Sequence, residues 1–186
     1  MNATRLQTLP AIEAALWREL GAATRERGHE WRVAVLATVE AGAAEARCVV
    51  LREVEAERRR VVFYSDARSP KVRQAENTPG ATLVLWSRSL SWQLRLRVQL
   101  EVLTSGLTVS SRWARLKMTP GAQDYLSPLP PGHALGSEAA PLPERGTREH
   151  FAVVIAQIES IDWLELHAEG HRRAAFDATG ARWLVP

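Results

Sequence analysis

The chain has 186 residues, of which 46% are hydrophobic and 24% carry a charge. These fractions are ordinary for a globular protein and exclude disordered and collagen-like chains, and the length fits a single domain over residues 1–186. No apolar run approaches the ~20 residues that span a bilayer, and the first residues do not form a signal-peptide pattern, so we expect no membrane partner. Cys48 is the single cysteine, which excludes an internal disulfide and a thiolate zinc site and favours a cytoplasmic location.

The net charge of +3 is carried mainly by arginine. These arginines alternate with acids, as in Arg52-Glu53-Val54-Glu55, and they do not form a tail. Proteins that bind nucleic acid concentrate positive charge on one face, so we expect no nucleic-acid partner. Nucleic-acid binding through Arg95 and Arg97 remains an alternative, and its affinity would fall as the salt concentration rises.

Three segments have the periodicity of a helix. Residues 8–27 repeat apolar side chains every four positions, which predicts an N-terminal helix with one buried stripe. Ser69 and Pro70 are typical of a helix start, so a short helix is expected over residues 69–77. A third helix is predicted over residues 109–117.

Period-two alternation predicts a series of strands. They cover residues 31–39, 44–51, 60–65, 81–87, 91–103, 151–158, 161–167, 172–176 and 182–185. The strand over 91–103 has one apolar and one polar face, and Ser160 is interpreted as a turn. Residues 119–147 contain six of the ten prolines and predict an irregular excursion before the C-terminal strands of residues 151–186. Many strands with short turns predict a mainly β fold, an antiparallel, Greek-key-like barrel with flanking helices.

Most catalytic motifs are absent from the sequence. His167 and His171 are four apart, but Gly170 between them breaks a helix, so no metal site is expected. Cys48 lies in the middle of a predicted strand and is interpreted as a small core residue. No nucleophile elbow, phosphate-binding P-loop or dinucleotide fingerprint is present.

An anion site is predicted where a strand leads into the second helix. Residues 65–71 run from the strand end to the helix N-terminus, whose free N–H groups and dipole favour a phosphate. Ser69, Arg68 and Lys71 add donors at the same place.

Three successive segments are informative as a set. They are Arg47-Cys48-Val49-Val50-Leu51-Arg52, Phe63-Tyr64-Ser65-Asp66-Ala67-Arg68-Ser69-Pro70-Lys71 and Trp92-Gln93-Leu94-Arg95-Leu96. In order and spacing they resemble the patterns R-x-V-L-L-K, F-[FY]-T-N-x-x-S-R-K and R-Q-V-R-V of the pyridoxamine 5′-phosphate oxidase family. Trp163 and Arg173 also keep that family's separation of ten residues.

The resemblance implies an FMN-binding split barrel that works as a homodimer, with the flavin in a cleft between subunits. Arg47 and Lys71 would hold the FMN phosphate with Ser69 beside it, and Arg68 would replace an arginine that is Pro70 here. The other implied flavin contacts are Cys48, Val49, Val50, Leu51, Arg52, Tyr64, Ser65 and Gln93, with Trp163 and Arg173 from the second subunit. Arg173 would also stabilise the reduced flavin. The implied activity passes a hydride from a small-molecule substrate to FMN and on to oxygen or another acceptor.

The family's substrate residues are kept only in part. Arg52, Arg115 and Thr119 match substrate-binding positions, whereas Glu169 stands where the family has a substrate-facing arginine. A carboxylate there repels an anion, so we expect little oxidation of pyridoxamine 5′-phosphate. The alternative is that this turn is shifted, so that His171 or Arg172 takes the arginine's place. A non-catalytic flavin carrier or redox sensor is the alternative function.

Overall fold

Strands dominate the computed structural model, which describes residues 5–135 and 150–186. The strands are β1 (Val33–Glu40), β2 (Ala43–Glu55), β3 (Arg60–Asp66), β4 (Gly80–Ser87), β5 (Trp92–Leu103), β6 (Phe151–Glu165), β7 (Arg172–Asp177) and β8 (Gly180–Leu184). The helices are α1 (Leu9–Arg25), α2 (Pro70–Asn77) and α3 (Gly106–Leu116), with short 3-10 helices η1 (Glu30–Arg32), η2 (Ala56–Arg58) and η3 (Pro120–Tyr125).

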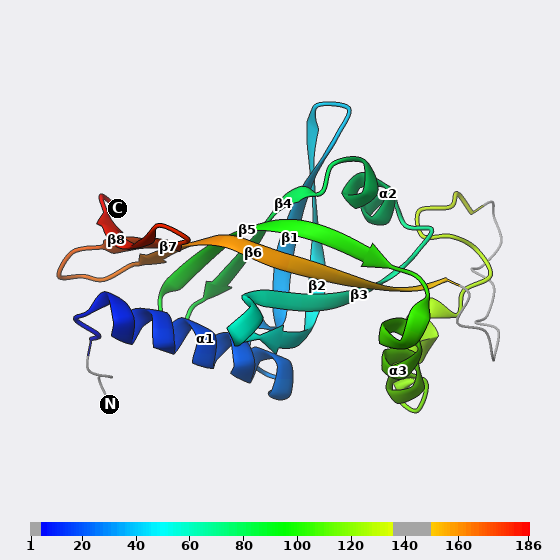
Figure 1. Ribbon diagram of the computed structural model, residues 1–186, viewed down its shortest axis with the longest axis horizontal. Helices are drawn as coiled ribbons and strands as arrows, with labels where there is room; N and C mark the ends of the chain where they lie inside the picture. The colour runs from blue at the N-terminus through cyan, green and yellow to red at the C-terminus, as the bar shows by residue number, and fades with distance from the viewer. Residues whose placement is uncertain (1–4, 136–149) are drawn as a thin grey trace.

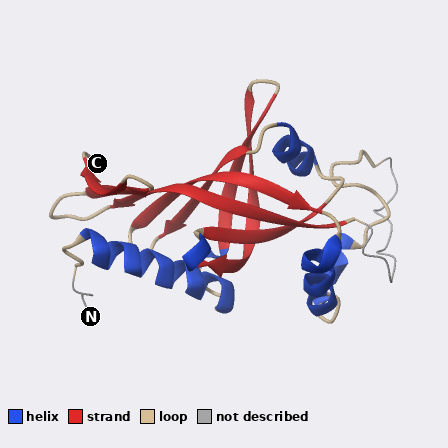
Figure 2. Ribbon diagram, viewed as in Figure 1, coloured by secondary structure: helices blue, strands red, loops and turns tan. Residues whose placement is uncertain are grey.

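The strands form one antiparallel sheet that closes on itself. Its order is β3-β2-β1-β4-β5-β6-β7-β8, and an additional pairing of β3 with β6 closes strands β1 to β6 into a barrel. Strands β7 and β8 continue the sheet beyond the barrel as the arm on the left of Figure 1. Figure 2 shows the three helices placed around this sheet, and the predicted β-barrel with flanking helices is confirmed.

Helix α1 covers one side of the barrel (Figure 1). Thr8 caps it by accepting a hydrogen bond from the Ala11 N–H, and Ile12, Leu16 and Leu20 are fully buried. This stripe belongs to the cluster that fills the barrel interior, so the helix is stabilised mainly by burial of its apolar face. The helix predicted over residues 8–27 is confirmed, and it ends two residues earlier.

Strand β6 is continuous over Phe151–Glu165, so the turn predicted at Ser160 is wrong. Arg97 pairs with Ser160 and Val98 pairs with Ile158, which leaves Glu159 as the extra residue of a β-bulge. The bulge accommodates two consecutive polar residues without interrupting the ladder, because β5 runs unbroken beside it.

The outer face of β1, β2 and β4 is apolar and exposed. Val33, Val35 and Trp86 are 48%, 39% and 45% exposed, whereas Ala34 and Leu36 between the valines point into the barrel. Cys48 pairs with Val35 and is also exposed, so its prediction as a core residue is wrong. The alternation placed it on the outer face, opposite its buried neighbour Val49.

A second hydrophobic cluster lies outside the barrel, under α3. Val109 and Leu116 of α3 pack there with Val62 of β3 and Phe151 of β6. Tyr125 of η3 joins this cluster, so the predicted excursion over 119–147 begins as a short 3-10 helix; its residues 136–147 lie outside the described residues. Within residues 5–135 and 150–186, no helix has the length and apolar character needed to cross a membrane.

Candidate functional site

Arg47, Lys71 and two serines form a polar cluster where β2 approaches the start of α2. Lys71 Nζ donates to Ser65 Oγ at 3.3 Å, and Ser65 Oγ lies 2.9 Å from Ser69 Oγ. Arg47 Nη2 donates to Gln74 Oε1 on α2 at 2.8 Å. Ser69 occupies the N-cap position of α2 without making a capping bond, so its hydroxyl is directed to this cluster. We call this group the Arg47–Lys71 cluster; two cations, two hydroxyls and a helix N-terminus meet there.

The two cations of the Arg47–Lys71 cluster repel each other. Burial lowers the pKa of Lys71, and the positive charge of Arg47 lowers it further. Asp66 acts in the opposite direction, but both its carboxylate oxygens are hydrogen-bonded to Arg68. An anion placed between Lys71 and Arg47 would replace this repulsion by attraction.

Arg68 lies outside this cluster. Its Nε and Nη2 donate to Asp66 at 3.0 and 2.7 Å, and this pairing raises the pKa of Arg68. The same guanidinium donates to the carbonyl oxygens of Ser127 and Pro128 at 2.8 and 3.1 Å. The structure therefore gives Arg68 the role of neutralising Asp66 and anchoring the loop after η3, which leaves Lys71 available to an anion.

An open cleft of about 740 Å³ lies beside α3. Its cationic residues are Arg27, Arg32, Arg52, Arg112 and Arg115, and we call it the arginine pocket. Thr119 lines it too, so the structure brings together three of the four predicted substrate residues. Arg52 is the extra residue of a β-bulge in β2, which directs its guanidinium to 5.7 Å from the centre of the Tyr64 ring.

One carboxylate, that of Glu53, lines the arginine pocket. Arg112 binds it through two hydrogen bonds of 2.9 and 2.6 Å, and the Tyr64 hydroxyl donates to it at 3.0 Å. Burial and the charge of Glu53 raise the pKa of Tyr64 to about 12, so the hydroxyl stays protonated at neutral pH. Because Arg112 compensates Glu53, the remaining arginines give the pocket a net positive charge.

Gln93 and Arg173 lie in one row on the outer face of the sheet. Gln93 pairs with Leu164, which pairs with Arg173, so two strand spacings, about 10 Å, separate them. Val50 lies in the same row on β2, five strand spacings or about 24 Å from Arg173 along the curved sheet. In a single chain, Gln93 and Arg173 are therefore far from the Arg47–Lys71 cluster.

Trp163 and His171 do not lie in the outer-face row of Gln93 and Arg173. Trp163 is fully buried, with ring centres 5.5 Å from Trp92 and 6.4 Å from Trp183. His171 lies in the exposed turn after β6, where its Nδ1 accepts from the His167 N–H, and Glu169 is exposed in the same turn. In this chain the structure brings none of these residues into the arginine pocket.

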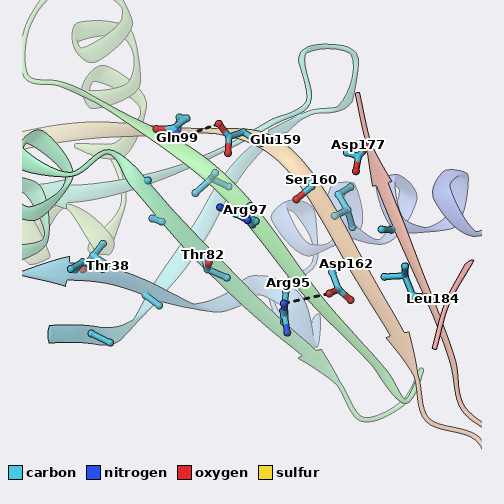
Figure 3. Close-up of a pocket in the computed structure, with 18 of the residues that line it drawn as sticks. Thr38, Thr82, Arg95, Arg97, Gln99, Glu159, Ser160, Asp162, Asp177 and Leu184 are labelled. Atoms are coloured by element: carbon cyan, nitrogen blue, oxygen red, sulfur yellow. Dashed lines mark hydrogen bonds and ion pairs between the residues drawn. The ribbon is translucent and has the colours of Figure 1, made fainter. Parts of the chain in front are cut away.

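The outer face also holds a hollow of about 660 Å³ (Figure 3). Arg95 and Arg97 of β5 line it opposite Asp162 and Ser160 of β6. Asp162 accepts two hydrogen bonds from Arg173, at 3.0 and 2.6 Å, and lies 3.4 Å from Arg95. Asp162 therefore fixes the guanidinium of Arg173 on this face.

Comparison with known proteins finds one matching family. Residues 14–104 match the family described as pyridoxamine 5′-phosphate oxidase, FMN-binding domain. The resemblance to the pyridoxamine 5′-phosphate oxidase family is confirmed over these residues. The matched residues run from α1 to the end of β5 and include Arg47, Lys71 and Gln93. FMN is the cofactor of this domain.

A curated relative and two solved structures support this resemblance. A pyridoxine/pyridoxamine 5′-phosphate oxidase of Caulobacter vibrioides is 27% identical over 161 residues, which cover 80% of this chain and 71% of the relative. A pyridoxamine 5′-phosphate oxidase-related, FMN-binding protein of Nostoc punctiforme has the same fold, with a TM-score of 0.72, 22% identity and coverage of 97% and 100%. PhzG of Burkholderia lata has a TM-score of 0.71 at 19% identity, with coverage of 95% and 92%.

The Arg47–Lys71 cluster fits the phosphate of FMN. A phosphate monoester is a dianion at neutral pH and would be matched by these two cations, in competition with the exposed Glu45 carboxylate, which lies 4.0 Å from Arg47 Nη2. The hydroxyls of Ser65 and Ser69 would donate to its remaining oxygens. Along β2, Cys48 and Val50 present side chains on the outer face, whereas Val49 and Leu51 are buried in the barrel.

We expect FMN affinity to depend on pH, because Lys71, which would hold the phosphate, has a lowered pKa. The ammonium is lost as pH rises through this pKa, so we expect FMN binding to be tight below it and to weaken above it. Lys71→Arg keeps its charge and is expected to abolish this weakening. Titration of flavin fluorescence from pH ~7, where the phosphate is already dianionic, upward checks this. Any titration of FMN itself affects both proteins equally. Equal pH dependence of FMN affinity in the parent and in Lys71→Arg would contradict the assignment of Lys71 to the phosphate.

Several residues of the Arg47–Lys71 cluster and of the arginine pocket were not predicted from the sequence. Gln74 lies one turn after Lys71, a spacing that places both on one face of α2. Arg112 lies three residues before Arg115 on α3, a similar signal. Arg27 and Arg32 reach the arginine pocket through tertiary packing, for which no local pattern exists.

Proposed function

We propose that the protein is a homodimeric, FMN-dependent oxidoreductase that oxidises a small anionic ring compound in the cytoplasm. The observation that carries this proposal is the arginine pocket. Arg52 in this pocket follows Arg47 by five residues on the same strand, about 17 Å along β2. A flavin carrier needs the Arg47–Lys71 cluster alone, whereas the pocket supplies a place for a second molecule next to the same strand.

The chemistry of the pocket supports an acidic substrate. The curated relative is named for pyridoxine and pyridoxamine 5′-phosphate, and PhzG was solved with tetrahydrophenazine-1-carboxylic acid. These names include a phosphate and a carboxylic acid. Arg52 Nε is buried without a hydrogen-bond partner among the described residues, and an acid in the pocket would supply one.

The two halves of the site support a homodimer. Arg47 and Lys71 lie at one end of the barrel surface, and Gln93 and Arg173 lie in a row several strands away. A second chain packed on the exposed apolar face of β1 and β4 would bring its own Gln93 and Arg173 to the first chain's cluster. Gln93 thus belongs with Arg173 in this proposal, both from the partner.

FMN, when bound, accepts a hydride and returns electrons to oxygen or another acceptor. The chain's own residues bind and orient the substrate. Arg52, Arg115 and Thr119 hold the acidic group of the substrate, and Tyr64 keeps its proton and forms one wall of the pocket. Asp162 accepts two hydrogen bonds from Arg173 and holds its guanidinium in one orientation on the outer face.

The test uses the FMN-loaded protein and a panel of ring amines, alcohols and dihydro-ring compounds that carry a phosphate or a carboxylate. We expect at least one to be oxidised over many turnovers, with pyridoxamine 5′-phosphate a poor substrate. Arg115→Gln is expected to lower kcat/KM at least tenfold while leaving FMN affinity unchanged, because Arg115 lies in the pocket and not in the cluster. The matched control is Lys117→Gln, two residues on and outside the pocket. Tight FMN binding without turnover of any compound would favour the flavin carrier.

A further inference from the structure

We propose that the arginine pocket takes a substrate with two separate acidic groups, the second held by Arg27 with help from Arg32. This inference rests on the proposed function, because it concerns the same pocket. Arg52, Arg115 and Thr119 come from β2 and the region of α3, whereas Arg27 and Arg32 come from the connection between α1 and β1. Figure 1 shows the C-terminal end of α1 on the side of the molecule nearest α3.

Of the arginines that the structure describes, those without an ion-pair partner are concentrated in this pocket. Most arginines of the sheet are paired with acids, as in Arg60 with Glu55 and Arg172 with Glu165. Among the described residues, Arg27, Arg52 and Arg115 have no ion-pair partner. Three unpaired cations in one cleft repel each other, which is tolerated where an anion binds between them.

Arg32 has a role that prepares this end of the pocket for an anion. Its Nη1 donates to the carbonyl oxygens of Ala23 and Thr24, at 3.4 and 3.3 Å, in the last turn of α1. Free carbonyls at a helix C-terminus repel an anion, and Arg32 neutralises them. Arg27 is exposed and makes no side-chain hydrogen bond within the described part of the chain, so its guanidinium is available to a ligand.

A single phosphate or carboxylate would neutralise only part of the positive charge of the arginine pocket. Arg52 and Arg115 supply the contacts that a single acidic group requires, and Arg112 is already bound to Glu53. The cleft of about 740 Å³ exceeds what one acidic group fills and has room for a ring between two such groups. A ring compound with two acidic groups would match both sets of arginines.

The test compares ligands that differ by one charge. Phenyl phosphate, the 3- and 4-carboxyphenyl phosphates and the corresponding uncharged carbamoylphenyl phosphates are titrated into the FMN-loaded protein by calorimetry at fixed ionic strength. We expect at least one carboxyl compound to bind about tenfold more tightly than its carbamoyl counterpart. Arg27→Gln is expected to abolish this preference and leave phenyl phosphate affinity unchanged, and Arg115→Gln to weaken all the compounds.

The control is Arg25→Gln, an exposed arginine two residues before Arg27 that does not line the pocket and is expected to keep the preference. Equal binding of carboxyl and carbamoyl compounds by the parent, or a preference that survives in Arg27→Gln, would overturn the second acidic subsite. Failure of every compound to bind while FMN still binds would overturn the proposed substrate pocket itself, which is a different result.

Discussion

Replacing Lys71 by methionine is expected to weaken FMN binding roughly 10–150-fold while leaving the FMN-free protein at least as stable as the parent. The loss of one charge-assisted contact to the phosphate costs about 1.5–3 kcal/mol of binding free energy. The unliganded protein, in contrast, is relieved of a half-buried ammonium beside Arg47, whose presence lowers the pKa of Lys71. Fluorescence titration gives the affinity, and thermal unfolding of the FMN-free protein gives the stability.

The control for this change is Lys117→Met, which alters the chain's other lysine at an exposed position. Riboflavin, which lacks the phosphate, should bind weakly to the parent and equally weakly to Lys71→Met. Arg47→Ala is expected to lose FMN affinity to a similar extent, but it also removes hydrogen bonds to Gln74 and to the Leu36 carbonyl oxygen and so lowers stability. A folded Lys71→Met protein with parental FMN affinity would remove Lys71 from the phosphate site.

Val35→Glu is expected to convert a dimer into a monomer and to weaken FMN binding at least 100-fold. Val35 is 39% exposed in the single chain, so a carboxylate there is tolerated by the protomer. In a symmetric interface the same charge enters from both subunits and meets its own copy, which costs several kcal/mol. Sedimentation should give about twice 20.7 kDa for the parent and 20.7 kDa for the variant.

The matched control is Leu107→Glu, an 89% exposed apolar residue on α3 and far from the apolar face of β1 and β4. It introduces the same charge and should leave both sedimentation and FMN affinity unchanged. A monomeric parent that binds FMN tightly would contradict the site shared between subunits. So would a Val35→Glu monomer with parental affinity.

The elements with one apolar and one polar face were predictable from sequence. Strand β5 and helix α1 have a single stripe that can face the interior, and both are buried as expected. Strand β1 is apolar on both faces, with Val33 and Val35 on one side and Ala34 and Leu36 on the other. Period-two alternation then cannot tell inside from outside, and for the same reason Cys48 on the neighbouring strand was misplaced.

The candidate site was predictable where its residues are close in sequence. Ser65, Ser69 and Lys71 lie on one strand-to-helix connection, whose chemistry indicates an anion. The partners of Arg68 at Ser127 and Pro128 are about 60 residues away, and no local pattern indicates that they withdraw Arg68 from the cluster. The sequence of the bulge at Glu159 resembles that of a turn. Whether the polar pair of Glu159 and Ser160 ends the strand depends on the pairing of β6 with β5, which the local sequence does not show.

The separation of the two hydrophobic clusters has an evolutionary consequence. The Arg47–Lys71 cluster is built on strands and a helix that share the barrel interior, so its geometry is inherited with the barrel. The wall that carries Arg112 and Arg115 rests on the outer cluster under α3, and Arg52 leaves the ladder at a bulge. Substitutions can therefore accumulate on that wall without repacking the barrel. A lineage can exchange its substrate in this way while keeping its flavin, which accounts for a chain whose cofactor motifs match the family more closely than its substrate residues do.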